Sequence, residues 1–412
     1  MISSSLQAAP SNGLAEMIIM SSSDSKSLKV LLITHSFSPE LTPPQRRWKA
    51  FTEVFVNRGN SVSVVAPNTG GKPFQITDAG IRIVRYPTFG RPKRLVFKAL
   101  RSALQALASI PACLFAGRPD VLIATVPALS TLLSGYIVSR LFRSKFVVDL
   151  RDSWPNLLSE SNILRSTKLE PIATKLILRV LSRADLVVTV TPGLGEVARL
   201  QGAHRVSVVS NGVDLSNYTS SLPRVSHDDS RLHVLYLGNL GLSQGLDLVI
   251  QAAAKLRSAV RVRFVGDGTE RERLQQLAAN LDAPVEFLHP VRGEKVLEQY
   301  AWADTCLVSL RSDWPSFEHT IPSKLYELLY FNRHITGLVR GEAARIIQES
   351  NSGDIVPQNV QSLVDHLKTM GASTASRNRK GIGPQWVLEN ASLDQLGDRY
   401  LSELTALAEG KR

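Results

Sequence analysis

The chain has 412 residues, which predicts two or three domains rather than one compact core. With 43% hydrophobic residues, 20% charged residues and a mean hydropathy of −0.01, the composition excludes a wholly disordered, collagen-like or polytopic membrane protein. The 48 Lys and Arg residues outnumber the 36 Asp and Glu residues, which gives a net charge of +12.

The positive charge is confined to the first half. Residues 1–215 hold 26 basic and 13 acidic residues, whereas residues 216–412 hold 22 and 23. This asymmetry predicts a nucleic-acid or membrane surface on the first half, or else a merely basic domain. Cys113 and Cys306 form no metal-binding or disulfide pattern, so we expect reduced thiols and a cytoplasmic location.

Residues 1–28 are rich in serine and lack the basic and apolar regions of a signal peptide, so we expect a disordered tail. Met17 or Met20 is an alternative start. The longest uncharged run, 121–139, approaches the length of a membrane span but contains Pro127 and Gly135. We interpret this run as a buried strand followed by a helix that starts at Pro127.

Short apolar runs alternate with amphipathic stretches, a pattern typical of parallel sheets covered by helices. The strands predicted in the first half are 29–34, 61–67, 81–85, 121–126, 145–149, 186–190 and 206–209. Those predicted in the second half are 233–237, 260–265, 285–289, 305–308, 335–338 and 353–356. The helices include 45–57, 246–256, 269–281 and 322–330, and a terminal helix spans 386–407.

Two complete sets of elements predict an α/β protein with two Rossmann-like domains. Polar stretches near 211–230 and 372–384 look like linkers. We therefore expect an N-terminal domain at 29–215, a C-terminal domain at 216–384 and a terminal helix within 385–412.

The loops after two predicted strands of the first half carry polar residues. The first loop lacks GxGxxG, which argues against a dinucleotide site, and it leads to Arg46 and Arg47. These arginines are candidates for phosphate contacts, or they lie on a solvated helix face. Further along, Arg151 and Asp152 follow a strand that ends in Asp149. The acids are suited to act as base or orienter, or else an Asp–Arg pair holds the turn.

The second half contains two glycine-rich turns and one informative helix start. Glycines at 238, 241, 266 and 268 allow close backbone approach of an anion or nucleotide. Pro322 fits the first position of a helix, with Ser323 and Lys324 in a first turn that suits a diphosphate. Glu327 lies on nearly the same face and can accept hydrogen bonds from two ribose hydroxyls. The alternative is a surface Lys–Glu pair of little energetic weight.

Seven short motifs occur in a specific order. They are SPE at 38–40, VVDLRDSWP at 147–155, TVTPGL at 189–194, SNGVD at 210–214, LGNLGLSQGLD at 237–247, VGDG at 265–268 and IPSKLYE at 321–327. With this order, the chain from about Lys29 to the terminal helix resembles a retaining GT-B glycosyltransferase of bacterial polysaccharide assembly. The subgroup it is similar to includes N-acetylfucosamine transferases of O-antigen and capsule synthesis.

The resemblance implies the GT-B fold, in which two Rossmann-like domains have parallel sheets facing a central cleft. It implies a hexosyltransferase-type activity with a nucleotide-sugar donor in the C-terminal domain, an acceptor mainly on the N-terminal domain, and a terminal helix that crosses back. Glu327 would hold the ribose, and backbone N–H groups around Ser323–Leu325 would hold the diphosphate. Gly268 and its neighbours would line the base pocket, with 289–291 near the base.

The expected site residues fall into three groups. The catalytic candidates are Asp152, His319 and Lys324. The donor-binding candidates are Gly238, Asn239, Gly241, Gln244, Gly266, Gly268, Pro290, Val291, Ser323, Lys324, Leu325 and Glu327. The candidates for the acceptor side of the cleft are Glu40, Arg46, Arg151 and Trp154.

The chain departs from the family pattern at several positions. The first glutamate of the family's E-x7-E motif falls at His319, and its phosphate-neutralising Arg and Lys align with Asn239 and Gln244. Lys324 would supply part of the missing charge. No acidic pair suited to a metal stands out in a donor loop, so we expect neither a metal nor another cofactor. Two alternatives stay open, a UDP-sugar 2-epimerase-like enzyme and an inactive paralogue that binds nucleotide sugars.

Residues 90–119 suggest a membrane role for the basic half. Leu100, Leu104 and Leu107 form one stripe, and Lys93, Arg94, Lys98 and Arg101 cluster at its start. Such a helix either lies on an anionic membrane surface or packs its apolar stripe on the sheet. We expect peripheral attachment to the inner face of the cytoplasmic membrane, where a polyprenyl-diphosphate-linked acceptor would be reached. We expect no nucleic-acid partner, because no recognised motif or aromatic platform is present.

Overall fold

The computed structural model describes residues 27–39, 43–69, 72–77, 79–88, 95–126, 128–152, 169–215, 222–223, 230–373 and 381–410. Most of the predicted N-terminal tail, together with Glu40, Lys93, Arg94, Pro127 and Trp154, lies outside the described residues.

The N-terminal half forms an eight-stranded sheet in the order β3-β4-β2-β1-β5-β6-β7-β8. Its strands are β1 (Lys29–Ile33), β2 (Ser61–Pro67), β3 (Phe74–Ile76), β4 (Arg82–Tyr86), β5 (Val121–Val126), β6 (Lys145–Leu150), β7 (Leu186–Thr189) and β8 (Val206–Val208). The pairing is parallel except between β3 and β4. The sequence analysis missed β3, a three-residue edge strand with two exposed side chains and no periodicity to mark it.

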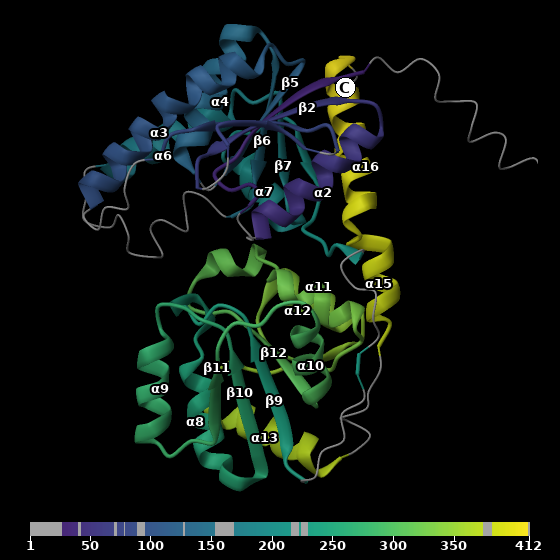
Figure 1. The fold of residues 1–412 in the computed structure, drawn as a ribbon. Coiled ribbons are helices and arrows are strands. Elements are labelled where there is room, and N and C mark those ends of the chain that lie inside the picture. The colour runs from purple at the N-terminus through teal and green to yellow at the C-terminus, as the bar shows by residue number, and fades with distance from the viewer. Residues whose placement is uncertain are drawn as a thin grey trace, which may run out of the picture.

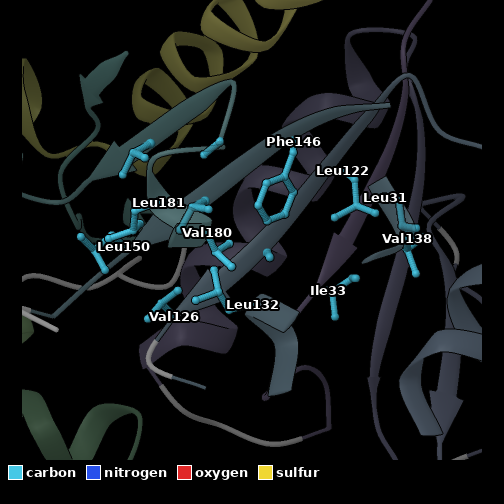
Figure 2. Packing of buried hydrophobic residues seen from close by; sticks show 14 of the residues in the cluster. Leu31, Ile33, Leu122, Val126, Leu132, Val138, Phe146, Leu150, Val180 and Leu181 are labelled. Carbon is cyan, nitrogen blue, oxygen red and sulfur yellow. The ribbon is translucent and has the colours of Figure 1, made fainter. Parts of the chain in front are cut away.

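Helices cover both faces of this sheet. They are α2 (Pro43–Asn57), α3 (Leu95–Ala116), α4 (Leu129–Phe142), α6 (Leu169–Leu181) and α7 (Pro192–Leu200). Alternate strand residues face opposite ways, so Leu31 and Ile33 join the core under α4 and α6, whereas Val30 and Leu32 join the core under α2. Figure 2 shows the first of these cores, with Phe146 among the leucines and valines of neighbouring strands.

The C-terminal half forms a six-stranded parallel sheet in the order β11-β10-β9-β12-β13-β14. The strands are β9 (Leu232–Leu237), β10 (Val260–Val265), β11 (Val285–Leu288), β12 (Thr305–Ser309), β13 (Ile335–Leu338) and β14 (Gly353–Ile355). The helices are α8 (Asp247–Leu256), α9 (Arg271–Asn280), α10 (Glu294–Trp302), α11 (Ser323–Tyr330), α12 (Gly341–Glu349) and α13 (Val360–Ala372). Short 3-10 turns are η2 (Leu242–Gln244), η3 (Arg257–Ala259) and η4 (Pro315–His319).

The prediction of one terminal helix at 386–407 is wrong, because the segment forms two helices. These are α15 (Gly383–Asn390) and α16 (Leu393–Ala408), which Ala391 and Ser392 separate, and Ser392 has extended backbone angles. The chain passing from the first domain to the second causes the break. Val213 donates its N–H to Ala391 O at 2.9 Å and accepts from Leu393 N at 3.3 Å, so it takes the place of helical bonds.

Helix α16 returns to the N-terminal sheet and packs beside α2 (Figure 1). Tyr400 lies among Trp48, Phe51 and Phe55, with ring centroids 5.5 to 6.1 Å apart. Figure 1 shows the two sheets in separate bodies, with α11 and α12 on the side of the lower body that faces α2 and α7. The chain therefore forms two parallel-sheet α/β domains joined at two crossings.

Candidate functional site

Two glycine turns lie against each other at the carboxyl ends of β9 and β10. Gly238 and Gly266 have φ of +151° and +150°, and a Cβ on Gly266 would overlap the Gly238 carbonyl. The turns are tied by hydrogen bonds from Gly238 N to Val265 O at 2.9 Å and from Leu240 N to Asp267 O at 2.8 Å. A Cβ on Gly268 would likewise overlap Leu240, so only glycine lets the two turns pack backbone against backbone.

Uncharged amides complete the first turn. The Gln244 Oε1 atom accepts hydrogen bonds from Gly241 N at 3.1 Å and from Asn239 Nδ2 at 3.4 Å. The Tyr236 hydroxyl donates to Asn239 O at 2.8 Å. The side-chain amides of Asn239 and Gln244 thus hold the turn itself.

Helix α11 starts beside these turns. It begins at Ser323 with Pro322 as the residue before it, one position later than predicted. Leu325 N donates to Pro322 O at 2.9 Å, and the Leu325 side chain is buried. Because the first N–H groups of a helix have no partner within it, those of Ser323 and Lys324 are the ones suited to an anion.

The Lys324 side chain folds back onto the end of β9. Its Nζ atom lies 3.7 Å from the centre of the Tyr236 ring, in a space lined by Leu235, Leu237, Cys306 and others. Burial lowers the pKa of Lys324 from 10.5 to about 7, against the opposite effects of Glu327 and the Cys306 thiol. This site therefore holds a cation whose charge depends on pH near neutrality.

Glu327 is held from both domains. The Tyr300 hydroxyl of α10 donates to Glu327 Oε2 at 2.7 Å. Arg46 of α2 places its Nη1 atom 3.6 Å from Glu327 Oε1, with side chains 58% and 18% exposed respectively. The sequence analysis missed Tyr300, because nothing in the spacing of α10 links it to a helix 27 residues later in the chain.

The loop after β11 adds the two remaining donor-side candidates. Pro290 is exposed, Val291 is partly buried against the core under α11, and Gly266 N donates to Leu288 O at 3.2 Å. The strands β9, β10 and β11 are neighbours in a parallel sheet, so Pro290 and the glycine turns all lie beyond the carboxyl ends of the strands, on the same side of the sheet.

His319 lies where the second domain touches the first. The Thr191 hydroxyl donates to His319 O at 2.8 Å and accepts from Leu194 N at 3.2 Å as the cap of α7. Next to it, Gly193 N donates to Glu342 Oε1 at 2.9 Å, and a Cβ on Gly193 would overlap the His319 ring. Residues 191–193 of the TVTPGL motif thus form a contact between the domains. Glu342 also takes part in this contact, and the sequence analysis did not find it.

The acidic candidates after β6 are in the N-terminal domain. Asp149 is fully buried with Arg47 Nη2 at 3.6 Å from its Oδ1 atom, which favours the structural interpretation of an Asp–Arg pair. Arg151 donates to Asn211 Oδ1 at 3.1 Å. Burial raises the pKa of Asp152, while Arg151 opposes this effect. Asp152 thus stays a candidate acid or base beside Arg151.

No three His, Cys, Asp or Glu side chains gather at a possible metal site within the part of the chain that the structure describes. Both cysteines are buried and free.

Comparison with known families and structures agrees with this architecture. Residues 44–212 match the glycosyl transferase 4-like domain and residues 231–372 match the glycosyl transferases group 1 family. The WcaI protein of Escherichia coli K12, a glycosyl transferase assigned to colanic acid biosynthesis, is 23% identical over 384 residues, which cover 83% of this chain and 91% of WcaI.

Two solved structures share the fold at low sequence identity. Sucrose-phosphate synthase from Thermosynechococcus elongatus has a TM-score of 0.73 at 14% identity, covering 93% of this chain and 99% of the synthase. HepE from Anabaena, solved with UDP and glucose, has a TM-score of 0.67 at 17% identity, covering 92% of this chain and 100% of HepE. The chain therefore belongs to the GT-B glycosyltransferases, with a glycosyl transferase 4-like domain followed by a group 1 domain.

Proposed function

We propose that this glycosyltransferase moves a sugar, with retention of configuration, from a nucleoside-diphosphate sugar to a lipid-linked acceptor in polysaccharide assembly. The observation that carries the proposal is the cluster of Glu327, Lys324 and the paired glycine turns at one edge of the second sheet. The HepE structure contains UDP, and WcaI is assigned to colanic acid biosynthesis, which supports a uridine donor and a polysaccharide product.

Each part of the donor has a matching group. The Glu327 carboxylate accepts hydrogen bonds from two ribose hydroxyls, since Tyr300 occupies only part of its acceptor capacity. We assign the diphosphate to the N–H groups of Ser323 and Lys324, beside the glycine turns and close to the Lys324 side chain. These groups stabilise the negative charge that develops on the leaving nucleotide, which lowers the barrier electrostatically.

A donor screen tests the assignment. We expect UDP or GDP, and one of their sugars, to stabilise the folded protein by RT ln(1 + [L]/Kd). This gain in unfolding free energy should appear as a rise in the melting temperature. Glu327→Ala should remove this rise, whereas Glu349→Ala, an exposed acid on α12, should not. An unchanged rise in Glu327→Ala would place the ribose site elsewhere.

Product analysis separates the activities. NMR of the glycoside should show the donor's anomeric configuration retained, and an inverted product would refute retention. Release of a free epimer without acceptor would identify the 2-epimerase alternative. Donor binding without any turnover would identify an inactive paralogue. Chelation tests the expected independence of metal, because loss of turnover with EDTA would contradict it.

One surface of the first domain suits an anionic membrane. We define the apolar face as the exposed side chains of β3, α3 and α4, namely Phe74, Ile76, Leu104, Leu107, Leu114, Phe115, Ile137 and Leu141. Small residues of α3, such as Ala112 and Cys113, face the sheet instead, whereas Leu104 and Leu107 of the predicted stripe are exposed. Residues 79–148 contain 11 Lys and Arg and the single acid Asp120, so an anionic surface complements this region.

Vesicle flotation tests this docking. We expect the protein to float with phosphatidylglycerol-containing vesicles and to be released by salt. The pair Leu107→Ser and Phe115→Ser, at sites 64% and 68% exposed, should weaken binding, whereas Leu200→Ser on α7 should not. Binding that is absent or insensitive to salt would overturn the proposal.

Among the described residues, no helix has both the length and the apolar character to cross a bilayer.

A further inference from the structure

Several polar and basic side chains beside the glycine turns of the C-terminal domain are engaged within the protein. The turn after β9 carries the amides of Asn239 and Gln244, which bond to each other and to Gly241 N. Arg271 donates to the carbonyls of Leu288 and Gly266, so its guanidinium holds the turns together.

Two further arginines near these turns are paired with carboxylates. Arg311 pairs with Asp313, with Nε 2.8 Å from Oδ1. Arg273 pairs with Asp247 and with Glu270, with its Nε 2.6 Å from Glu270 Oε2. Lys324 lies against the Tyr236 ring, and burial lowers its pKa to about 7, so its charge is not permanent near neutral pH. Arg271, Arg273 and Arg311 are therefore engaged within the C-terminal domain.

Arg46 brings a permanent charge to the site from the other domain. Its guanidinium lies 3.6 Å from Glu327 Oε1 although the side chain is 58% exposed. An ion pair this exposed adds little to stability, so folding alone does not explain a cation at this place. A guanidinium also keeps its charge at any physiological pH and has a fork of donors that fits phosphate oxygens.

We propose that Arg46 is the permanent cation of the donor diphosphate, and that it exchanges Glu327 for phosphate when the donor binds. The inference rests on the proposed function. Ribose and phosphate are adjacent in a nucleotide, and Glu327 lies one helical turn from the Ser323–Lys324 N–H groups. When ribose hydroxyls occupy Glu327, the released guanidinium is within reach of the phosphates, and the charge gained by the departing diphosphate strengthens this contact.

A nucleotide series tests the exchange, because it separates phosphate contacts from ribose contacts. Calorimetry would measure the affinity of the full-length protein for uridine, UMP and UDP. We expect Arg46→Gln to weaken UDP binding by about tenfold or more, the loss of a charge-assisted hydrogen bond. Uridine affinity should stay equal or rise, because Glu327 no longer pairs with Arg46. Arg46→Lys should restore part of the UDP affinity.

Lys49→Gln is the matched control, because Lys49 is 57% exposed on the same helix and pairs with Glu53 instead. Its affinities should match those of the unmodified protein. If Arg46→Gln weakens uridine and UDP equally, Arg46 only orients Glu327 and the inference is wrong. If it changes neither affinity, the inference is also wrong. Failure of the unmodified protein to bind any nucleotide would instead reject the proposed function.

Discussion

Donor binding should take up a proton at Lys324. In the free protein the pKa of Lys324 is about 7, because the ammonium is buried against Tyr236. A bound diphosphate favours the charged form, so the pKa rises in the complex and affinity falls as pH increases above 7. With a free-state pKa of about 7, the protonated fraction drops roughly eightfold between pH 7.5 and 8.5, and UDP affinity should drop equally.

Calorimetry of UDP binding measures this effect in two ways. The dissociation constant should rise across that pH range, and experiments in buffers of different ionisation enthalpy should show uptake of roughly 0.8 proton at pH 7.5. Lys324→Arg should give a flat profile, because arginine stays protonated. Uridine, which lacks phosphates, should also bind independently of pH. A flat UDP profile with no proton uptake in the unmodified protein would refute the reasoning.

Three substitutions probe the turns, the returning helix and the domain contact. Gly266→Ala should abolish UDP binding because its Cβ overlaps the neighbouring turn, whereas Gly371→Ala, with open space around its Cβ, should bind normally in the same titration. Leu404→Ala, at a fully buried site on α16, should cost about 2–5 kcal/mol in urea unfolding. A loss well below about 1 kcal/mol would contradict the packing of α16 on the first domain. Gly193→Ala should lower turnover by pushing His319 away while the melting temperature changes little, and unchanged turnover would argue against this contact.

Local sequence patterns predicted the sheets because buried parallel strands are continuous apolar runs. Runs such as 121–126 and 260–265 reappear as β5 and β10 with the same bounds. The same reasoning missed β3, since a short exposed edge strand has no apolar run. It also predicted one helix in place of α15 and α16. The chain at Val213, which bonds between these two helices, is more than 170 residues earlier in the sequence.

The candidate site also has some features that the sequence predicted and others that only the structure shows. The two Rossmann-like domains, the glycine turns and the helix beside Ser323–Glu327 were predictable from the sequence, because each depends on neighbouring residues and on the carboxyl ends of parallel strands meeting on one side of a sheet. The tertiary structure was needed to show that Tyr300 and Arg46 hold Glu327. It was also needed to show that Asp149 is buried with Arg47 and that Leu104 and Leu107 of α3 are exposed. These contacts join residues far apart in the chain, so side-chain packing, rather than any local pattern, sets which groups meet and which charges are buried.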